Sequence, residues 1–274
     1  MIEIRRLLEL DQFAEAVQLQ QDIWGFTDRE LLPVRLFVVA TKIGGHLFGA
    51  YDGDRMVAFL VAIPGLKEGE QGYLHSHMMG VLPDYRNHGL GRKLKLAQRE
   101  DALTRGIPLV EWTFDPLELK NAYLNIEKLG AIVRRYLFNN YGQTSSPLHQ
   151  GLPTDRLVAE WWVSHPRAVA AVGGEAPTGF EAARSGSEGG ASFSLRGASA
   201  PLPEGRVSAP TIEARIPIES NIADLRRTDP AKAREIQLRA SEQFTEHFRK
   251  GLAVVGFERS ADHGTYLLAP WDSK

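Results

Sequence analysis

A glycine turn flanked by basic residues carries the clearest chemical signal in this sequence. The turn reads Arg86-x-x-Gly89-x-Gly91 and stands between an alternating apolar segment and a basic amphipathic one. Unpaired N–H groups at a helix start attract anions, and glycines let a phosphate come close to the backbone. The stretch 84–105 holds six Lys or Arg against three Asp or Glu, a local charge of +3 in a chain of net charge −2. We therefore expect a bound anion at this loop.

Two common phosphate loops are excluded at this position. No Gly-Lys-Ser or Gly-Lys-Thr follows, as a Walker loop requires, and the spacing is not the Gly-x-Gly-x-x-Gly of dinucleotide-binding folds. Short glycine patterns also match by chance, so an ordinary strand-to-helix turn is the alternative when the motif is taken alone.

Hydrophobic periodicity predicts the elements that hold this loop. Alternation predicts strands near residues 2–6, 46–51, 56–63, 73–81, 108–114, 131–136 and 157–163. Helical spacing predicts helices at 11–24, 33–43, 89–105 and 117–129, the first with Asp11 as its N-cap. The mixture of strands and helices predicts an α/β fold with a mixed sheet over residues 1–165.

The composition changes sharply after this first region. Of the 38 residues from 173 to 210, 25 are Gly, Ala, Ser or Pro. Such a segment buries too little apolar surface to offset its ordering entropy, so we expect residues 166–210 to be a linker or loops, with one weak strand at 192–196. Residues 211–274 then predict a smaller accessory α+β unit. Its expected parts are a strand at 211–218, a helix at 230–250 and a hairpin of 252–257 with 265–269.

Composition also excludes several classes of protein. The chain has no cysteine, which removes disulfide scaffolds, thiol nucleophiles and cysteine metal sites. Its slightly acidic charge argues against nucleic-acid binding. Apolar runs such as 36–40 and 59–63 are far shorter than the roughly 20 residues that cross a bilayer. We therefore expect a protein without membrane or nucleic-acid partners, and a cytoplasmic one, since the first residues do not resemble a secretory signal.

The wider sequence around the glycine turn resembles the GNAT superfamily of N-acyltransferases. Val81-x-Pro83-x-Tyr85-Arg86 matches the lead-in to the acyl-CoA loop of that superfamily, and residues 121–131 resemble its second motif. The resemblance covers residues 1–163, with the same order of elements. Residues 76–78, 112–117 and 155–156 resemble a branch of predicted acetyltransferases, which this chain would extend at its C-terminus.

The resemblance implies that acetyl-CoA, or a larger acyl-CoA such as succinyl-CoA, is the co-substrate. Amides of the loop would hold the pyrophosphate, the strand before it would pair with the pantetheine arm, and two asparagines of the next helix would reach that arm. The implied cofactor-binding residues are Met79, Gly80, Val81, Arg86, Asn87, His88, Gly89, Leu90, Gly91, Arg92, Asn121 and Asn125.

The catalytic groups are less well marked by the sequence. In the superfamily an amine attacks the thioester directly, helped by a general base. His77 and Glu111 are our candidates for the base, because each lies in a predicted strand near the loop. The resemblance places the usual tyrosine acid at the position of Ile126, so the nearby Tyr123 is the candidate acid. His75 and His77 also form a possible metal pair, but no third ligand is evident, so we expect no metal.

Three functions are consistent with these features. The first is transfer of an acyl group to a small-molecule amine such as an amino acid. Arg134 and Arg135, with the aromatic run at 136–141, are candidates to bind a carboxylated acceptor or acyl group, and an edge strand with solvated charges is the alternative. The second is acetylation of a protein N-terminus or lysine. The third is an acyl-CoA sensor without turnover, which the loss of the tyrosine favours. A homodimer is possible.

Overall fold

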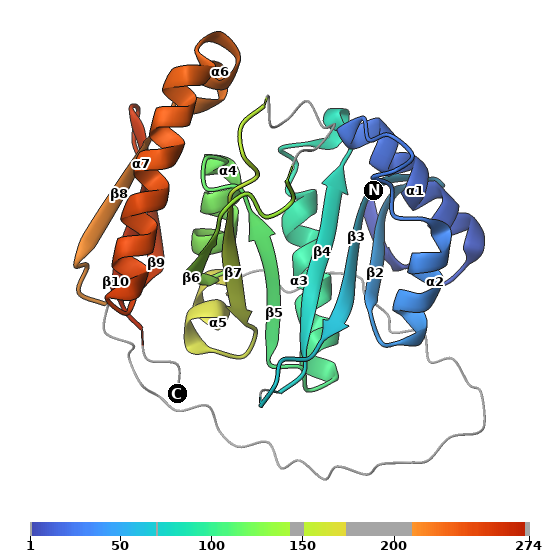
Figure 1. Cartoon of the computed structure of the whole chain (residues 1–274). Helices are drawn as coiled ribbons and strands as arrows, with labels where there is room; N and C mark the ends of the chain where they lie inside the picture. The colour runs from blue at the N-terminus through green and yellow to red at the C-terminus, as the bar shows by residue number, and fades with distance from the viewer. Residues whose placement is uncertain (1, 70, 143–150, 174–209, 272–274) are drawn as a thin grey trace.

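Ten strands form a single mixed sheet in the computed structural model, which describes residues 2–69, 71–142, 151–173 and 210–271 (Figure 1). Their spatial order is β1-β2-β3-β4-β5-β7-β6-β9-β10-β8. The strands are β1 (Ile2–Arg6), β2 (His46–Asp52), β3 (Arg55–Gly65), β4 (Tyr73–Val81), β5 (Leu109–Phe114), β6 (Ile132–Leu137), β7 (Arg156–Trp162), β8 (Ala214–Glu219), β9 (Leu252–Arg259) and β10 (His263–Pro270).

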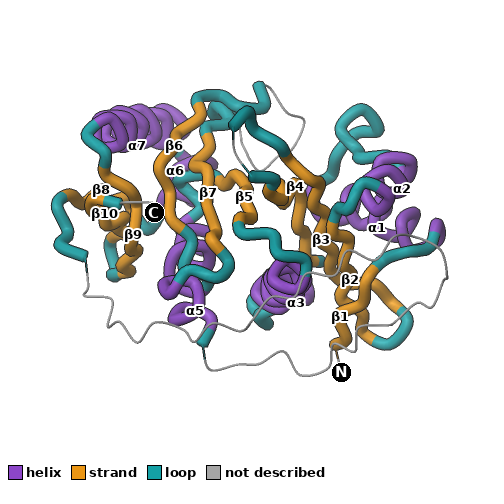
Figure 2. The backbone as a smooth tube through the Cα atoms, turned by 90° about the horizontal axis from the view of Figure 1, so that it is seen from below, coloured by secondary structure: helices purple, strands orange, loops and turns teal. Residues whose placement is uncertain are grey.

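Helices cover both faces of the sheet. They are α1 (Leu10–Trp24), α2 (Val34–Lys42), α3 (Leu90–Thr104), α4 (Leu119–Tyr123), α5 (Pro166–Val172), α6 (Ile222–Thr228) and α7 (Pro230–Arg249), with a 3-10 turn η1 (Pro83–Tyr85) and a π-helical turn η2 (Leu124–Lys128). Figure 2 shows α1 and α2 on one side of the central strands and α3 and α5 on the other. In the described part of the chain no helix is long and apolar enough to cross a membrane.

The predicted order of elements in the first region is confirmed, with local differences. Helix α1 begins at Leu10 rather than after Asp11, because Glu9 is the N-cap and its N–H donates to Gln12 at 3.0 Å. The helix expected at 117–129 is an α-helical turn followed by a π-helical one.

Two short helices were not predicted. Helix α5 lies inside the expected linker, and α6 precedes the predicted long helix. Both have only seven residues, too few for a clear helical period. The weak strand expected at 192–196 lies outside the described residues.

The pairing of β4 is the feature that matters most for function. On one edge β4 runs antiparallel to β3, with an irregularity between the pairs Ala62↔Ser76 and Val61↔Met78 that leaves His77 as an extra residue, a β-bulge. On the other edge β4 runs parallel to β5, but only Leu74↔Val110 and His75↔Glu111 are paired. Beyond these pairs the two strands diverge toward their C-terminal ends (Figure 1).

The C-terminal strands continue the same sheet. Strand β9 pairs with β6 at Val133↔Val254, and β10 and β8 follow it outward. Helix α7 packs on β6, β8 and β9, and its Phe244 shares one apolar cluster with Trp112 of β5. The apolar core is therefore continuous from the first region into the extension. That residues 211–274 form a separate accessory unit stays a prediction.

A buried ion pair joins the extension to the segment after β5. Arg226 of α6 donates to Asp115 at 2.7 Å and to Glu118 at 2.9 Å. The side chains of Arg226 and Asp115 are only 6% and 9% exposed. Asp115 also accepts the N–H of Leu117 at 2.8 Å. Asp115 follows the end of β5 and faces the extension.

Removing Arg226 is expected to destabilise the whole fold. Arg226→Ala leaves the buried Asp115 carboxylate without its cation, so the free energy of unfolding in urea should fall by about 3–5 kcal/mol. Arg227→Ala is the control, because Arg227 is 70% exposed and its pair with Asp224 lies within the same helix; its change should stay within about 0.5 kcal/mol. Equal effects of the two substitutions would contradict the importance of this contact.

Candidate active site

The loop between β4 and α3 is built to present backbone N–H groups. Asn87 and Gly89 have positive φ values of 65° and 76°, and Gly89 is the N-cap of α3. No side chain caps this helix end, so the first-turn amides keep their capacity for an external acceptor. Residues 86–89 are exposed, and a β-carbon at Gly89 would meet no atom within 4 Å. An anion therefore has free access to the positive end of a 15-residue helix.

The side chains around the loop mostly brace it. Arg86 donates from Nε to the carbonyl of Val81 at 3.1 Å, and Arg92 donates to the carbonyl of Val172 at 3.4 Å. Leu90 is buried, whereas His88 is exposed. The anion contacts predicted for Arg86 to Arg92 are therefore best supplied by the backbone.

The three predicted cofactor residues at the end of β4 differ in orientation. Met79 faces α3, since its Cε would lie 3.3 Å from a β-carbon on Gly91. Gly80 faces α1, where a β-carbon would lie 2.7 Å from Trp24. Val81 is partly exposed at the end of β4.

The two predicted asparagines differ in exposure. Asn121 in α4 is exposed, whereas Asn125 in η2 is buried.

Polar side chains gather on the face of β4 and β5 that is turned away from α3. His75 and His77 lie with ring centroids 5.8 Å apart, and His75 is the register partner of Glu111. Thr113, two residues further along β5, is within 2.8 Å of the Tyr141 hydroxyl. Burial lowers the pKa of both histidines. Both imidazoles are therefore neutral at pH 7 and able to accept a proton.

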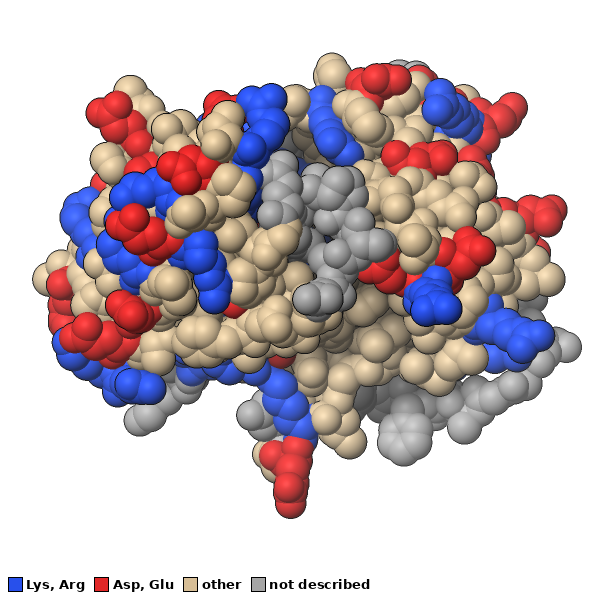
Figure 3. All heavy atoms as spheres, turned by 45° about the horizontal axis from the view of Figure 1, so that its top comes forward, with Lys and Arg blue, Asp and Glu red and all other residues tan. Residues whose placement is uncertain are grey.

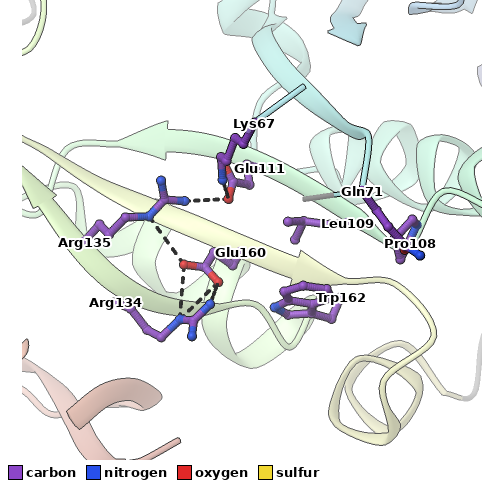
Figure 4. A pocket seen from close by; sticks show the side chains of 9 residues that line it. All are labelled: Lys67, Gln71, Pro108, Leu109, Glu111, Arg134, Arg135, Glu160 and Trp162. Carbon is purple, nitrogen blue, oxygen red and sulfur yellow. Dashed lines mark hydrogen bonds and ion pairs between the residues drawn. The ribbon is translucent and has the colours of Figure 1, made fainter. Parts of the chain in front are cut away.

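A pocket of about 640 Å³ opens beside this polar face. Figure 4 shows its lining, which comprises Lys67, Gln71, Pro108, Leu109, Glu111, Arg134, Arg135, Glu160 and Trp162. Lys67 comes from the β3–β4 connection, the two arginines from β6, and the glutamates from β5 and β7. Pairing of these strands brings residues nearly 100 positions apart into one cavity.

The pocket holds its cations on buried carboxylates. Glu111 accepts from Lys67 at 2.7 Å and from Arg135, and Glu160 accepts from Arg134 and lies 3.5 Å from Nε of Arg135. The two carboxylates are 5% and 3% exposed, whereas the Arg135 side chain is 42% exposed. The cationic heads thus face the cavity with the carboxylates beneath them. Three cations and two carboxylates give the lining a charge of +1.

The wider surface does not repeat this pattern. In the view of Figure 3, acidic and basic side chains are interspersed, and no large field of one sign forms. Charge recognition on this face therefore depends on local groups rather than on a long-range field.

The structure brings together two of the three predicted catalytic residues. His77 and Glu111 lie near the same end of the strand separation. Glu111 is already engaged by two cations, so its geometry suits positioning better than proton abstraction. Tyr123 lies elsewhere, with the Arg259 guanidinium 5.0 Å from its ring centroid. Ile126, at the expected position of the acid, is fully buried.

Sequence reasoning missed two components of the site. Lys67 and Glu160 gave no motif signal, because their partners are distant along the chain. Strand register could have found Glu160, since it is paired with Glu111 across β5 and β7. Among the described residues no group of three or more His, Asp or Glu side chains is arranged to hold a metal ion.

A family profile matches the part of the chain that contains the loop. Residues 44–127 match the acetyltransferase (GNAT) domain. That range runs from the start of β2 to η2 and includes the strand separation. The sequence has no match among curated proteins.

Several solved structures are similar in fold. The ribosomal-protein alanine N-acetyltransferase of Escherichia coli is 20% identical, with a TM-score of 0.47, covering 60% of this chain and 96% of that one. A putative GNAT acetyltransferase from Desulfovibrio desulfuricans is 16% identical, with a TM-score of 0.47 and coverages of 60% and 100%. YncA, a putative acetyltransferase from Salmonella typhimurium with its cofactor acetyl-CoA, is 13% identical, with a TM-score of 0.48 and coverages of 60% and 96%.

Proposed function

Because this chain carries a GNAT acetyltransferase domain, we propose that it is an N-acyltransferase that moves an acetyl group from acetyl-CoA to the amine of a small molecule bearing an anionic group. The observation that carries this proposal is the β4–β5 separation, which has an exposed anion-binding loop at its open end and a polar pocket beside its closed end. A donor with a charged head and an acceptor with a charged tail suit these two ends.

The donor is positioned by the backbone. The pyrophosphate of acetyl-CoA binds the amides at the start of α3, where the helix dipole favours negative charge. The pantetheine arm follows β4 toward His77, where the edge facing β5 lacks a strand partner. Backbone N–H groups along that edge polarise the thioester carbonyl and stabilise the oxyanion that forms on attack.

The acceptor amine must be neutral when it attacks. His77 is the general base in this proposal, since its imidazole is neutral at pH 7 and lies at the bulge where the strands begin to separate. Glu111 positions Lys67 and Arg135, and those cations hold the anionic group of the acceptor. Arg135 uses Nη2 and Nε for the two glutamates, and a guanidinium has five N–H donors in all.

A Gly89 substitution tests the donor site. Gly89→Glu places a carboxylate at the loop and a side chain at a left-handed φ, so the Kd for acetyl-CoA should rise by about 30-fold or more, measured by calorimetry. Gly53→Glu is the matched control, because Gly53 also has a positive φ, 61°, and open space around it. Unchanged affinity in Gly89→Glu would show that the loop does not bind the donor.

The base is tested by the pH dependence of kcat in a thiol-release assay. Burial depresses the pKa of His77, so the limb on which kcat rises with pH lies below pH 6.5. His77→Gln should remove that limb and lower kcat about 100-fold. Glu111→Gln should lower kcat without removing the limb, since Glu111 acts through its cations. If Glu111→Gln removed the limb instead, Glu111 would be the general base and His77 the positioning residue.

The acceptor class is tested by comparing amines with and without a carboxylate. Arg135→Gln should raise KM for carboxylated amines about tenfold or more, because a hydrogen bond between charged groups contributes roughly 1.5–3 kcal/mol. KM for neutral amines should change little. Arg215→Gln, which breaks an exposed pair with Glu258, serves as the control. Acetyl-CoA binding without turnover on any amine would favour the sensor, and turnover only on peptides would favour a protein acceptor.

A further inference from the structure

A buried lysine lies at the point where β4 and β5 separate. Lys95 of α3 is 2% exposed, and its Nζ donates to Ser76 Oγ of β4 at 2.8 Å. The same Nζ lies 3.7 Å from the ring centroid of Trp112 in β5. Ser76 and Trp112 directly follow His75 and Glu111, the last pair that joins β4 to β5. The lysine therefore spans the two strands where their hydrogen bonding ends.

The surroundings of Lys95 solvate an ammonium without neutralising it. Its third contact is Gln98 Oε1 at 3.1 Å, so the three N–H groups have a hydroxyl, an amide oxygen and an aromatic face as partners. Among the described residues, no carboxylate pairs with Nζ. Glu111 is on the opposite face of β5, where Lys67 and Arg135 hold it.

Burial without a counter-ion has two consequences. It lowers the pKa of Lys95 well below its ordinary value, which makes the ammonium a stronger acid. His75, on the other face of β4, has its pKa lowered by burial and, to a smaller extent, by neighbouring charges that include Lys95. Burial of this charge also lowers the stability of the fold. Replacing a buried charged side chain by an apolar one of similar volume is often neutral or stabilising.

The position of Lys95 matches the place where negative charge develops in the reaction. From Val81 to Ser76 the strand spans five residues, or about 17 Å at roughly 3.3 Å per residue. An extended pantetheine arm that starts at the loop brings its sulfur to this end of the separation. When the C–S bond breaks, the sulfur carries a full negative charge beside an ammonium that has no other counter-ion.

We propose that Lys95, acting with Ser76, stabilises and protonates the CoA thiolate that leaves in this reaction; the inference rests on the proposed acyltransferase function. The amine nitrogen forms a bond to the acyl carbon, and the C–S electron pair goes to sulfur. Ser76 gives its hydroxyl proton to sulfur and receives one from the Lys95 ammonium. His77 takes the proton lost by the acceptor amine and releases it to solvent, and solvent reprotonates Lys95, which leaves an amide and CoA thiol.

Lys95 and Ser76 supply an acid where the second sequence motif lacks its usual tyrosine. Ile126 occupies the position where the resemblance places a tyrosine acid, and Tyr123 packs near Arg259 instead. If the acid reaches the sulfur from α3, the reaction needs neither a tyrosine at position 126 nor Tyr123.

The test needs no knowledge of the acceptor. CoA is titrated into the protein while the ultraviolet absorbance of its thiolate is followed against pH, with desulfo-CoA as the blank for tyrosine ionisation. In the wild type, the ratio of thiolate to thiol in bound CoA should be about tenfold higher than in free CoA at the same pH, which is about 1.4 kcal/mol. Lys95→Met should abolish this excess while changing the Kd for CoA less than about threefold.

Controls separate the charge of Lys95 from its bulk. Lys250→Met removes a lysine that is 59% exposed at the C-cap of α7, and it should leave the thiolate excess unchanged. Ser76→Ala should reduce the excess in part. Thermal unfolding without CoA should show Lys95→Met at least as stable as the wild type; should it fail to fold, Ser76→Ala still provides the comparison.

Turnover supplies an independent readout. In the wild type, kcat should fall at alkaline pH as the Lys95 ammonium loses its proton. This fall should occur below pH 10.5, the ordinary pKa of a lysine. Lys95→Met should lose that limb and about 100-fold in kcat. If CoA binds to the wild type without any thiolate excess, the proposed role of Lys95 is wrong, whereas the acyltransferase proposal is unaffected. Failure of CoA to bind at all would overturn the acyltransferase proposal and this inference with it.

Discussion

The short parallel pairing between β4 and β5 is the constraint on which the rest of the site depends. Only two residue pairs join these strands, and the β-bulge at His77 begins where the pairing stops. A parallel edge left open in the middle of a ten-stranded sheet exposes backbone N–H and C=O groups that need partners. An extended ligand arm supplies such partners. The divergence also leads from the α3 N-terminus at one end to the pocket at the other.

The two faces of this separation differ in chemistry. On the α3 side, Lys95 is a buried cation among neutral partners, without a carboxylate beside it. On the opposite side, Glu111 and Glu160 are buried carboxylates, each held by partly exposed cations. Burying a charge without a counter-ion is costly, so the Lys95 arrangement limits stability locally. The first suits an anion that appears during reaction, and the second suits an anion that arrives with the acceptor.

The C-terminal extension supports this site from outside. Arg226 clamps Asp115 and Glu118, the Tyr266 hydroxyl donates to the carbonyl of Pro116 at 2.7 Å, and the Phe257 N–H donates to Glu127 at 2.6 Å. These contacts reach the segment that follows β5 and the short α4–η2 pair. A helix of five residues and a π-helical turn have little stability of their own. The extension therefore fixes the wall of the separation that faces α3.

The sequence alone determined the local features of this protein. Alternation and helical spacing placed most elements, and the residues from Arg86 to Gly91 predicted the loop that we propose to bind an anion, because a helix start and its glycines are adjacent along the chain. Only the tertiary structure decided which polar residues meet. Glu160 joins Glu111 through strand register, Lys67 reaches it from another connection, and Asp115 turns to Arg226, 111 residues away. From the sequence alone, Lys95 is indistinguishable from the other basic residues of an amphipathic helix. Its burial depends on the packing of α3 beneath two diverging strands, and no pattern confined to α3 contains that information.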